Sequence, residues 1–405
     1  MPKRVGGIGS LRLVVTNRQA RISLTTSFAS TGVLVGSWAA RIPALQNEFH
    51  FSLARLGVTL ACMTVGAISS SPLAGFVSPR YGSRSLLRIT APFQAFAFAF
   101  IALAPSRILL ALALFLLGAV NGLVQVSMNA QAIALEGRYG RTILTMMHGG
   151  FSIGMMAGAL VASLVAHLGV SYRIHLLAVS ALLLVVGIGI GFFLIETERA
   201  ARAHRRRIRL SLALTVIIVV SFFELFCEGT ATSWSAVYAH RIGSSAAVAA
   251  LTFGLYSLTM TVGRLRGDRL VVRMGVGRLV RVGSAVAICG LGLALALPTP
   301  LAVLVGFALF GLGLSCLAPT LFRAAGQLPL PEGQGLAALL VASWPAFLLV
   351  APVIGGLSKV ISLREALLVT LGAGLVVVAL SGALGRLAPT PLGTSESTSK
   401  PEFPL

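Results

Sequence analysis

The chain has 405 residues, of which 56% are hydrophobic and 11% charged, whereas soluble domains carry about 25% charged residues. Its net charge of +21 would indicate nucleic-acid binding in a soluble protein. The basic residues lie instead in short patches between apolar stretches, as in membrane proteins whose cytoplasmic loops retain Lys and Arg near lipid head groups. Composition therefore excludes a soluble fold and a nucleic-acid partner, and it predicts an integral membrane protein in contact with membrane lipids.

Apolar stretches of about 20 residues, enough to cross a bilayer, recur in two sets of six. The first set covers 22–45, 54–77, 86–105, 108–135, 143–168 and 173–195, and the second covers 210–238, 247–266, 278–298, 301–324, 335–358 and 363–386. We therefore predict an all-α polytopic protein of about twelve transmembrane helices, with one six-helix bundle at 22–195 and another at 210–386.

Three further segments flank and join these bundles. We expect a basic cytoplasmic N-terminus at 1–21, a basic cytoplasmic linker at 196–209, and a disordered cytoplasmic tail at 387–405 that is rich in Pro, Ser and Thr. With both termini inside, about 25 Lys and Arg fall on the cytoplasmic side and about 7 outside, which is the asymmetry that sets orientation in membranes.

The two halves show weak internal repetition. Ser37-Trp38-Ala39-Ala40 resembles Ser233-Trp234-Ser235-Ala236, and Arg80-Tyr81-Gly82 resembles Arg273-Met274-Gly275 at a similar offset. Related halves are common in transporters.

Acidic residues inside apolar spans are the first candidates for chemistry, because a charge at mid-bilayer costs about 2.5–3.5 kcal/mol on the mildest scale. Only Glu224 and Glu228 lie well inside a span. Their spacing of four residues places them on one helix face, where two carboxyl groups in a low dielectric resist double ionisation. They fit proton coupling; alternatively, either one serves only as an interhelical hydrogen-bond acceptor.

Polar and aromatic side chains in other spans suggest a solute cavity. An amide stripe in the fourth span and the three tryptophans either line such a cavity or stabilise the helix packing and the membrane interface. His148 opens the fifth span and is either a protonation site or structural. The cavity candidates are Trp38, Asn121, Gln125, Asn129, Gln131, Trp234, Tyr238 and Trp344.

Several other classes of function lack the residues they need. The four cysteines are scattered singly, without the spacing of a metal site. No Walker loop and no hydrolase or metalloprotease motif is found in the sequence. We therefore expect no cofactor, no metal and no enzymatic activity.

Four motifs together resemble a known family. Gly75-Phe76-Val77-Ser78-Pro79-Arg80-Tyr81-Gly82-Ser83-Arg84 is similar to the loop between helices two and three of the major facilitator superfamily, with Pro79 where Asp is usual. Ser127-Met128-Asn129-Ala130-Gln131, His148-Gly149-Gly150-Phe151-Ser152 and Glu228-Gly229 resemble a bacterial inner-membrane subgroup related to the fucose permeases. Gln125 and Ser233 stand where that subgroup commonly has acids.

The resemblance implies two bundles around a central cavity that opens alternately to either side, driven by an ion gradient. It leaves Glu228 as the main coupling residue, with Glu224 and Glu136 as weaker candidates; His148 is a further candidate because histidine is easily protonated near neutral pH. The resemblance also implies a cytoplasmic gate formed by Arg80, Arg84, Arg264, Asp268, Arg269 and Arg273.

These observations lead to one main hypothesis and two alternatives. The main hypothesis is a monomeric, proton-coupled carrier of a small polar, sugar-like solute in the bacterial inner membrane. The alternatives are an exporter of a toxic or secreted small molecule, and a receptor or scaffold that has lost transport because the acids expected at positions 79, 125 and 233 are missing.

Overall fold

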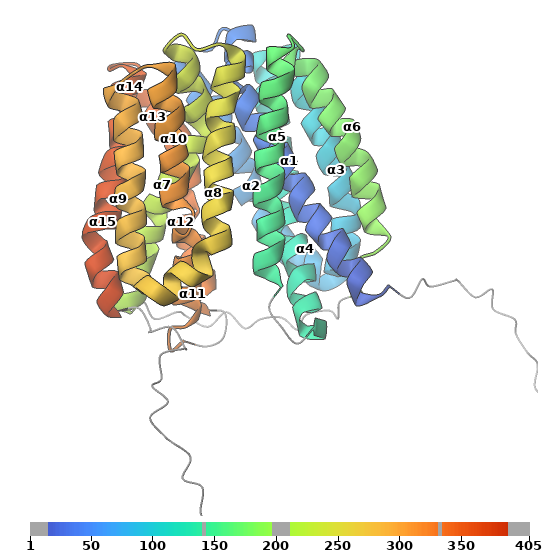
Figure 1. Ribbon diagram of the computed structural model, residues 1–405. Helices are drawn as coiled ribbons and strands as arrows, with labels where there is room; N and C mark the ends of the chain where they lie inside the picture. The colour runs from blue at the N-terminus through green and yellow to red at the C-terminus, as the bar shows by residue number, and fades with distance from the viewer. Residues whose placement is uncertain (1–14, 140–142, 197–210, 331–333, 388–405) are drawn as a thin grey trace, which may run out of the picture.

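The computed structural model describes residues 15–139, 143–196, 211–330 and 334–387. Within them the chain is almost entirely α-helical (Figure 1). Most of the basic N-terminus, the linker after Glu196 and the tail after Leu387 lie outside the described residues, as do the predictions made for them.

The first half of the chain forms six helices. They are α1 (Asn17–Glu48), α2 (Leu53–Tyr81), α3 (Ser83–Leu103), α4 (Arg107–Tyr139), α5 (Leu144–His167) and α6 (Tyr172–Gly191). Each overlaps one of the first six predicted spans, which confirms those predictions.

The second half contains the other six spans, three of them broken. The helices are α7 (Leu212–Arg241), α8 (Ala246–Met274), α9 (Val276–Ala296), α10 (Pro300–Leu314), α11 (Leu317–Gly326), α12 (Gln334–Ser343), α13 (Pro345–Leu357), α14 (Leu363–Ala366) and α15 (Leu368–Leu387). Proline explains two of the breaks, because it lacks an N–H and its ring clashes with the preceding turn. Pro319 follows the break between α10 and α11, and Pro345 opens α13.

Local signals start many of these helices. Hydroxyl side chains accept a hydrogen bond from the first turn of α1, α6, α7, α8, α10 and α14, which satisfies N–H groups that have no partner inside the helix. The capping residues are Thr16, Ser171, Ser211, Ser245, Thr299 and Ser362.

Eleven helical spans in the described residues are long and apolar enough to cross a membrane. The helix that falls short is α1, which is 32 residues long but carries Arg18, Arg21 and Arg41 among many small polar residues. Much of α1 is buried against its neighbours, so its polar residues are not all presented to lipid.

The repeated loops adopt the same backbone conformation. Gly82, between α2 and α3, has φ 81° and ψ 149°, and Gly275, between α8 and α9, has φ 73° and ψ 162°. Positive φ strains residues that carry a Cβ. Each glycine therefore allows a sharp reversal between two long helices at corresponding places in the two halves.

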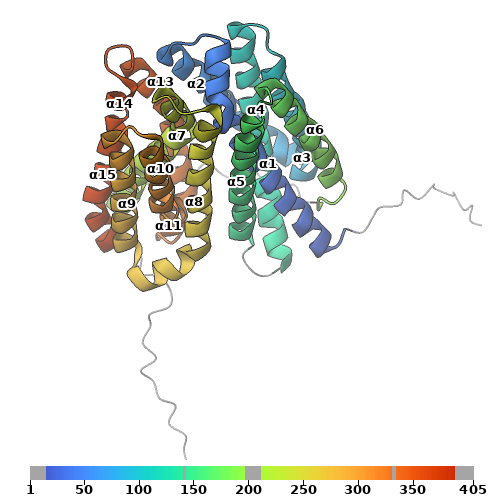
Figure 2. The ribbon, with the colours of Figure 1, turned by 45° about the horizontal axis from the view of Figure 1, so that its top comes forward.

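The halves stand side by side, α1 to α6 in one group and α7 to α15 in the other (Figures 1 and 2). Extensive packing between them involves α1, α2 and α5 of the first half and α7, α8 and α13 of the second. In Figure 1 the groups meet at the upper end, where α2 begins, and diverge at the lower end, where α4 and α11 end.

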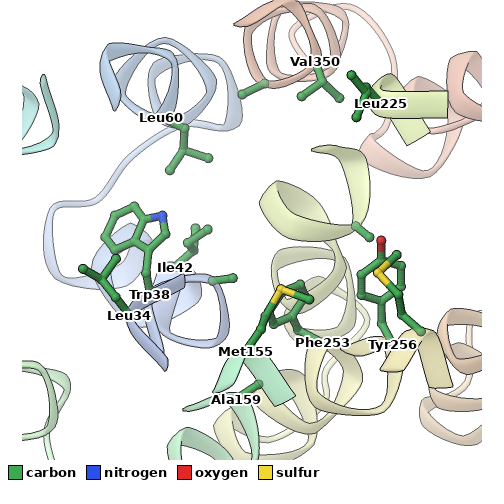
Figure 3. Packing of buried hydrophobic residues seen from close by; sticks show 14 of the residues in the cluster. Leu34, Trp38, Ile42, Leu60, Met155, Ala159, Leu225, Phe253, Tyr256 and Val350 are labelled. Atoms are coloured by element: carbon green, nitrogen blue, oxygen red, sulfur yellow. The ribbon is translucent and has the colours of Figure 1, made fainter. Parts of the chain in front are cut away.

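Close approach across the halves depends on small and apolar residues. Gly57 on α2 lies against the backbone of Ala351 and Gly355 on α13. Between α5 and α8, Met155 and Ala159 pack beside Phe253, as Figure 3 shows.

Polar contacts also join the two halves. The Asn47 amide lies 2.9 Å from His240 Nε2, and the Ser163 hydroxyl donates to the Ala247 carbonyl at 2.9 Å.

Candidate functional site

An ion pair lies between the middle of α7 and α8. Arg264 Nη2 is 3.5 Å from Glu228 Oε1, and the two side chains remain 21% and 18% exposed. A charge in an apolar span needs a partner, and each of these two residues is the partner of the other. Their residual exposure leaves the pair accessible to a solute or to water.

A proline explains why Arg264 takes up its position. Pro319 cannot donate an N–H to the Ser315 carbonyl four residues earlier. Arg264 Nε donates to that carbonyl at 3.4 Å. The break between α10 and α11 therefore supplies a backbone acceptor that helps to hold the guanidinium in place.

The same guanidinium reaches the other half of the protein. Arg264 Nη1 donates to Ser152 Oγ on α5 at 2.8 Å, and Ser152 Oγ donates to the His148 carbonyl at 3.3 Å. Thr261, one turn before Arg264, donates to the Ser152 carbonyl at 3.2 Å. We call Glu228, Arg264, Ser152 and Ser315 the inter-half cluster, because it joins α5 to α7, α8 and α10.

His148 lies one turn before Ser152 on α5. Its ring stands edge-on to Phe28 of α1, with 4.9 Å between the ring centroids. Its side chain is exposed, so it lies at the edge of the inter-half cluster rather than in a dry core. Its role in coupling stays a prediction.

Glu224 has a different environment from Glu228, although they share a helix and are one turn apart. Glu224 is 1% exposed, and neither carboxyl oxygen has a hydrogen-bond partner among the described residues. It lines a small cavity inside the second half together with Cys227, Ser284 and Thr370. The structure therefore does not bring Glu224 into the inter-half cluster.

The amides of α4 differ in their surroundings. Gln131 is fully buried and joins three segments: Nε2 donates to Ser83 Oγ at 2.9 Å and to the Ile195 carbonyl at 3.0 Å, while Oε1 accepts from Ile195 N at 3.1 Å. Asn121 accepts from Gln94 of α3 at 2.8 Å. Through these contacts, Gln131 and Asn121 link helices of the first half.

The other two amides of the stripe remain half-buried. Asn129 Nδ2 donates within its own helix to the Gln125 carbonyl at 2.8 Å. Asn129 and Gln125 are therefore the amides of the stripe for which lining the solute cavity stays a prediction.

The aromatic candidates are mostly buried. Trp38 is 5% and Trp234 0% exposed, and Trp234 lies beside Gly355 where α13 meets α2. Tyr238 donates its hydroxyl to the Ala294 carbonyl of α9 at 3.1 Å. Trp344, at the break before α13, is 43% exposed with its ring centroid 6.4 Å from that of Phe347.

The gate candidates other than Arg264 lie toward the lower end, where the halves diverge. Arg84 pairs with Glu196 at 2.9 Å, and Arg80, Arg269 and Arg273 have exposed side chains. The Asp268 side chain is outside the described part of the structure. Glu136 accepts from the Ile143 N–H at 2.7 Å and so links α4 to the residue that precedes α5.

Arg264 is the residue whose setting the sequence interpretation missed. The family resemblance assigned it to the gate, a role that stays a prediction, and the structure places it against Glu228 in the inter-half cluster. Counting basic as well as acidic residues inside apolar spans would have singled it out, because the same cost applies to both signs of charge. Ser152 and Ser315 carry no comparable signal, since serine is common in membrane helices.

The comparisons with known proteins agree with this architecture. The family model described as Major Facilitator Superfamily matches residues 22–344. An uncharacterized transporter of Sinorhizobium fredii is 32% identical over 346 residues, which are 84% of this chain and 92% of that protein. Membrane protein MosC of Rhizobium meliloti is 31% identical over 373 residues, 91% of each chain.

Solved structures share the fold at low sequence identity. The crystal structure of a D-xylose-proton symporter matches with a TM-score of 0.75 and 15% identity, covering 92% of this chain and 98% of the other. The nucleoside transporter NupG matches with a TM-score of 0.69 and 15% identity, covering 91% and 98%.

Proposed function

Because the chain belongs to the major facilitator superfamily and is a multi-pass transmembrane transporter, we propose that it carries a small polar, sugar-like solute with protons. The observation that carries this proposal is the inter-half cluster. Arg264 contacts the acid Glu228 on one side and Ser152 of the opposite half on the other. A change at Glu228 is thereby linked to a contact that the two halves must break when they move.

The proposed coupling step is protonation of Glu228. A protonated carboxyl no longer attracts the guanidinium as a charge, and it gains an O–H donor. Arg264 is then held less firmly, and its N–H groups and the Glu228 carboxyl can hydrogen-bond to solute hydroxyl groups. Proton and solute binding would favour the same rearrangement of the halves, which is the requirement for coupling by population shift.

We also propose that both termini face the cytoplasm of a bacterial inner membrane. The excess of Lys and Arg on that side supports this orientation. The upper end in Figure 1, where the two groups of helices meet, would then face outward and be closed, with the halves diverging toward the cytoplasm. Reporter fusions at the C-terminus test this orientation. A fused fluorescent protein should be bright and a fused alkaline phosphatase should be inactive, and the reverse pattern contradicts the proposal.

Transport in proteoliposomes tests the function. Radiolabelled sugars, sugar acids and amino acids are assayed for uptake and for counterflow, with and without an imposed pH gradient. One pH unit is worth about 1.4 kcal/mol, so one-to-one coupling predicts about tenfold accumulation of the correct solute. Glu228→Gln should keep counterflow but lose accumulation.

Glu48→Gln is the matched control, because Glu48 forms an exposed ion pair with Arg173 at 2.9 Å. It should accumulate solute like the unmodified protein. If Glu228→Gln still accumulates solute, Glu228 is not the coupling residue. If the pH gradient drives solute out of the vesicles, the transporter is an exporter, and if nothing on the panel moves, the polar-solute proposal is wrong.

A further inference from the structure

The small cavity beside Glu224 lies inside the second half, and none of the four residues of the inter-half cluster lines it. The space in it open to the centre of a water molecule is about 10 Å³, and about 10–15 Å³ is needed to hold one water. Its polar lining consists of Glu224, Cys227, Ser284 and Thr370, from α7, α9 and α15, and the rest is apolar or glycine. The cavity thus has room for one very small ligand.

Three buried polar atoms of this lining have no hydrogen-bond partner among the described residues. They are Glu224 Oε1, Glu224 Oε2 and Ser284 Oγ, and the two residues are 1% and 2% exposed. Leaving a buried polar group unpaired costs about 1–3 kcal/mol. A ligand that hydrogen-bonds to all three would remove that cost.

Thr370 presents an acceptor to the same space. Thr230 donates its one hydroxyl proton to the Phe226 carbonyl at 2.9 Å, so the 3.0 Å contact between Thr230 and Thr370 requires Thr370 to donate. Thr370 Oγ1 then has no further proton to donate, and its two lone pairs can only accept. Its partner in the cavity must carry a hydrogen or a positive charge.

The charges around Glu224 limit what can bind. Among the described residues, the titratable or charged groups that interact electrostatically with Glu224 are Cys227 and Glu228 on α7 and Tyr256 and Arg264 on α8, whereas the cavity-lining residues from α9, α10, α11 and α15 are uncharged. Arg264 is engaged with Glu228. An ionised Glu224 would therefore be a buried carboxylate without a cation of its own, at a cost of several kcal/mol, unless a proton or small cation accompanies it.

We propose that Glu224, Ser284 and Thr370 form a second proton-binding site, enclosed in the second half, that holds a protonated carboxyl with one water molecule. A proton fits better than a metal cation because the cavity offers few oxygen atoms and mostly apolar walls. A role of this site in transport rests on the proton coupling proposed above. Protonation of the site does not depend on that coupling. It would hold a proton one helical turn from Glu228.

Infrared spectroscopy of the full-length protein in lipid, at neutral pH and without solute, tests the site. The unmodified protein should show the carbonyl band of a protonated carboxylic acid, and ¹³C-labelled glutamate should shift it. Glu224→Gln should remove the band. Ser284→Ala should move the band to higher frequency, because the Ser284 hydroxyl is lost from the hydrogen-bonded group in the cavity.

Ser343→Ala is the matched control, because Ser343 is buried in the same half but donates to Leu339 in its own helix at 2.7 Å. Its spectrum should keep the band unchanged. A band that survives Glu224→Gln overturns the proposal. So does a sodium-induced change in the carboxylate bands that Glu224→Gln abolishes, since that would assign the site to sodium. Neither outcome depends on transport, so failure of this site and failure of Glu228 coupling can be told apart.

Discussion

Arg264 uses three different nitrogen atoms on three partners: Nη2 faces Glu228, Nη1 donates to Ser152 and Nε to Ser315. A planar guanidinium suits this arrangement because its donors are fixed in direction, whereas the lysine ammonium is a compact charge on a flexible stem. The geometry, and not the positive charge alone, therefore links the two halves.

Arg264→Lys tests this distinction. Lysine keeps the charge but cannot serve all three partners, and a lost hydrogen bond is worth about 1 kcal/mol. We expect proton-driven uptake to slow by about tenfold or more, measured as the initial rate at saturating solute. Arg266→Lys, two residues away and exposed, should leave the rate unchanged. Equal rates for both variants would show that charge alone suffices.

Gln131 is a polar residue whose contacts are structural. Its three hydrogen bonds join α4 to Ser83 and Ile195. At about 0.5–1.5 kcal/mol each, they explain why a fully buried amide is retained in an apolar helix.

Gln131→Leu should lower the free energy of unfolding by about 2–4 kcal/mol, because it removes these bonds and leaves the Ile195 N–H without its partner. The melting temperature in detergent measures the loss. Asn129→Leu is the comparison, since that amide donates within its own helix, and it should be much less destabilising. Similar losses in both variants would argue against the linking role of Gln131.

At the scale of elements, glycine spacing decides how closely α1 and α5 approach. Gly32 and Gly36 on α1 face the α5 backbone, and Gly154 and Gly158 on α5 face the α1 backbone. Small residues spaced four apart allow such contact in membrane helices. Gly154 and Gly158 form a GxxxG pattern in the sequence, and the structure identifies α1 as the helix that packs against it.

Gly36→Leu should destabilise the first half, because a Cβ at this position would meet the backbone of Met155 and Ala159. Overpacking of this kind costs about 1–3 kcal/mol, and more where backbone must move. Gly189→Leu on α6 is the control, since a Cβ there has no neighbour within 4 Å. Melting temperatures should fall for the first variant only, and an unchanged value for Gly36→Leu would contradict the packing described here.

At the scale of the whole molecule, the halves are held together mainly through α2 with α13 and α5 with α8. Gly57 sits at the first of these contacts. Because the halves of a carrier must separate there in one state and close in another, the packing at Gly57 should set the balance between the two states.

Gly57→Trp should prevent closure at the upper end and favour the opposite state. Counterflow should be lost while the melting temperature stays close to that of the unmodified protein. Spin labels on cysteines replacing Gly137 at the lower end of α4 and Gly326 at the lower end of α11 should move closer together. Gly356→Trp, where a Cβ would have no neighbour within 4 Å, should change neither measurement, and an unchanged label distance in Gly57→Trp would refute the idea.

The order and approximate ends of the membrane spans, though not the breaks within three of them, could be read from the sequence, because a bilayer requires about 20 apolar residues per crossing whatever the neighbours are. The same cost of buried charge singled out Glu228 and Glu224. Both inferences rest on how single segments interact with lipid, which is a local property of the sequence.

Tertiary structure alone decided which polar residues share a site. It gave Glu228 and Glu224 different surroundings although they lie one turn apart, paired Arg264 with Glu228, and bound Gln131 to Ile195. In helices that are apolar on nearly every side, the helical period does not show which face turns inward. That choice depends on the close packing of neighbouring helices and on carbonyl groups freed by proline, and neither is visible until the helices are assembled.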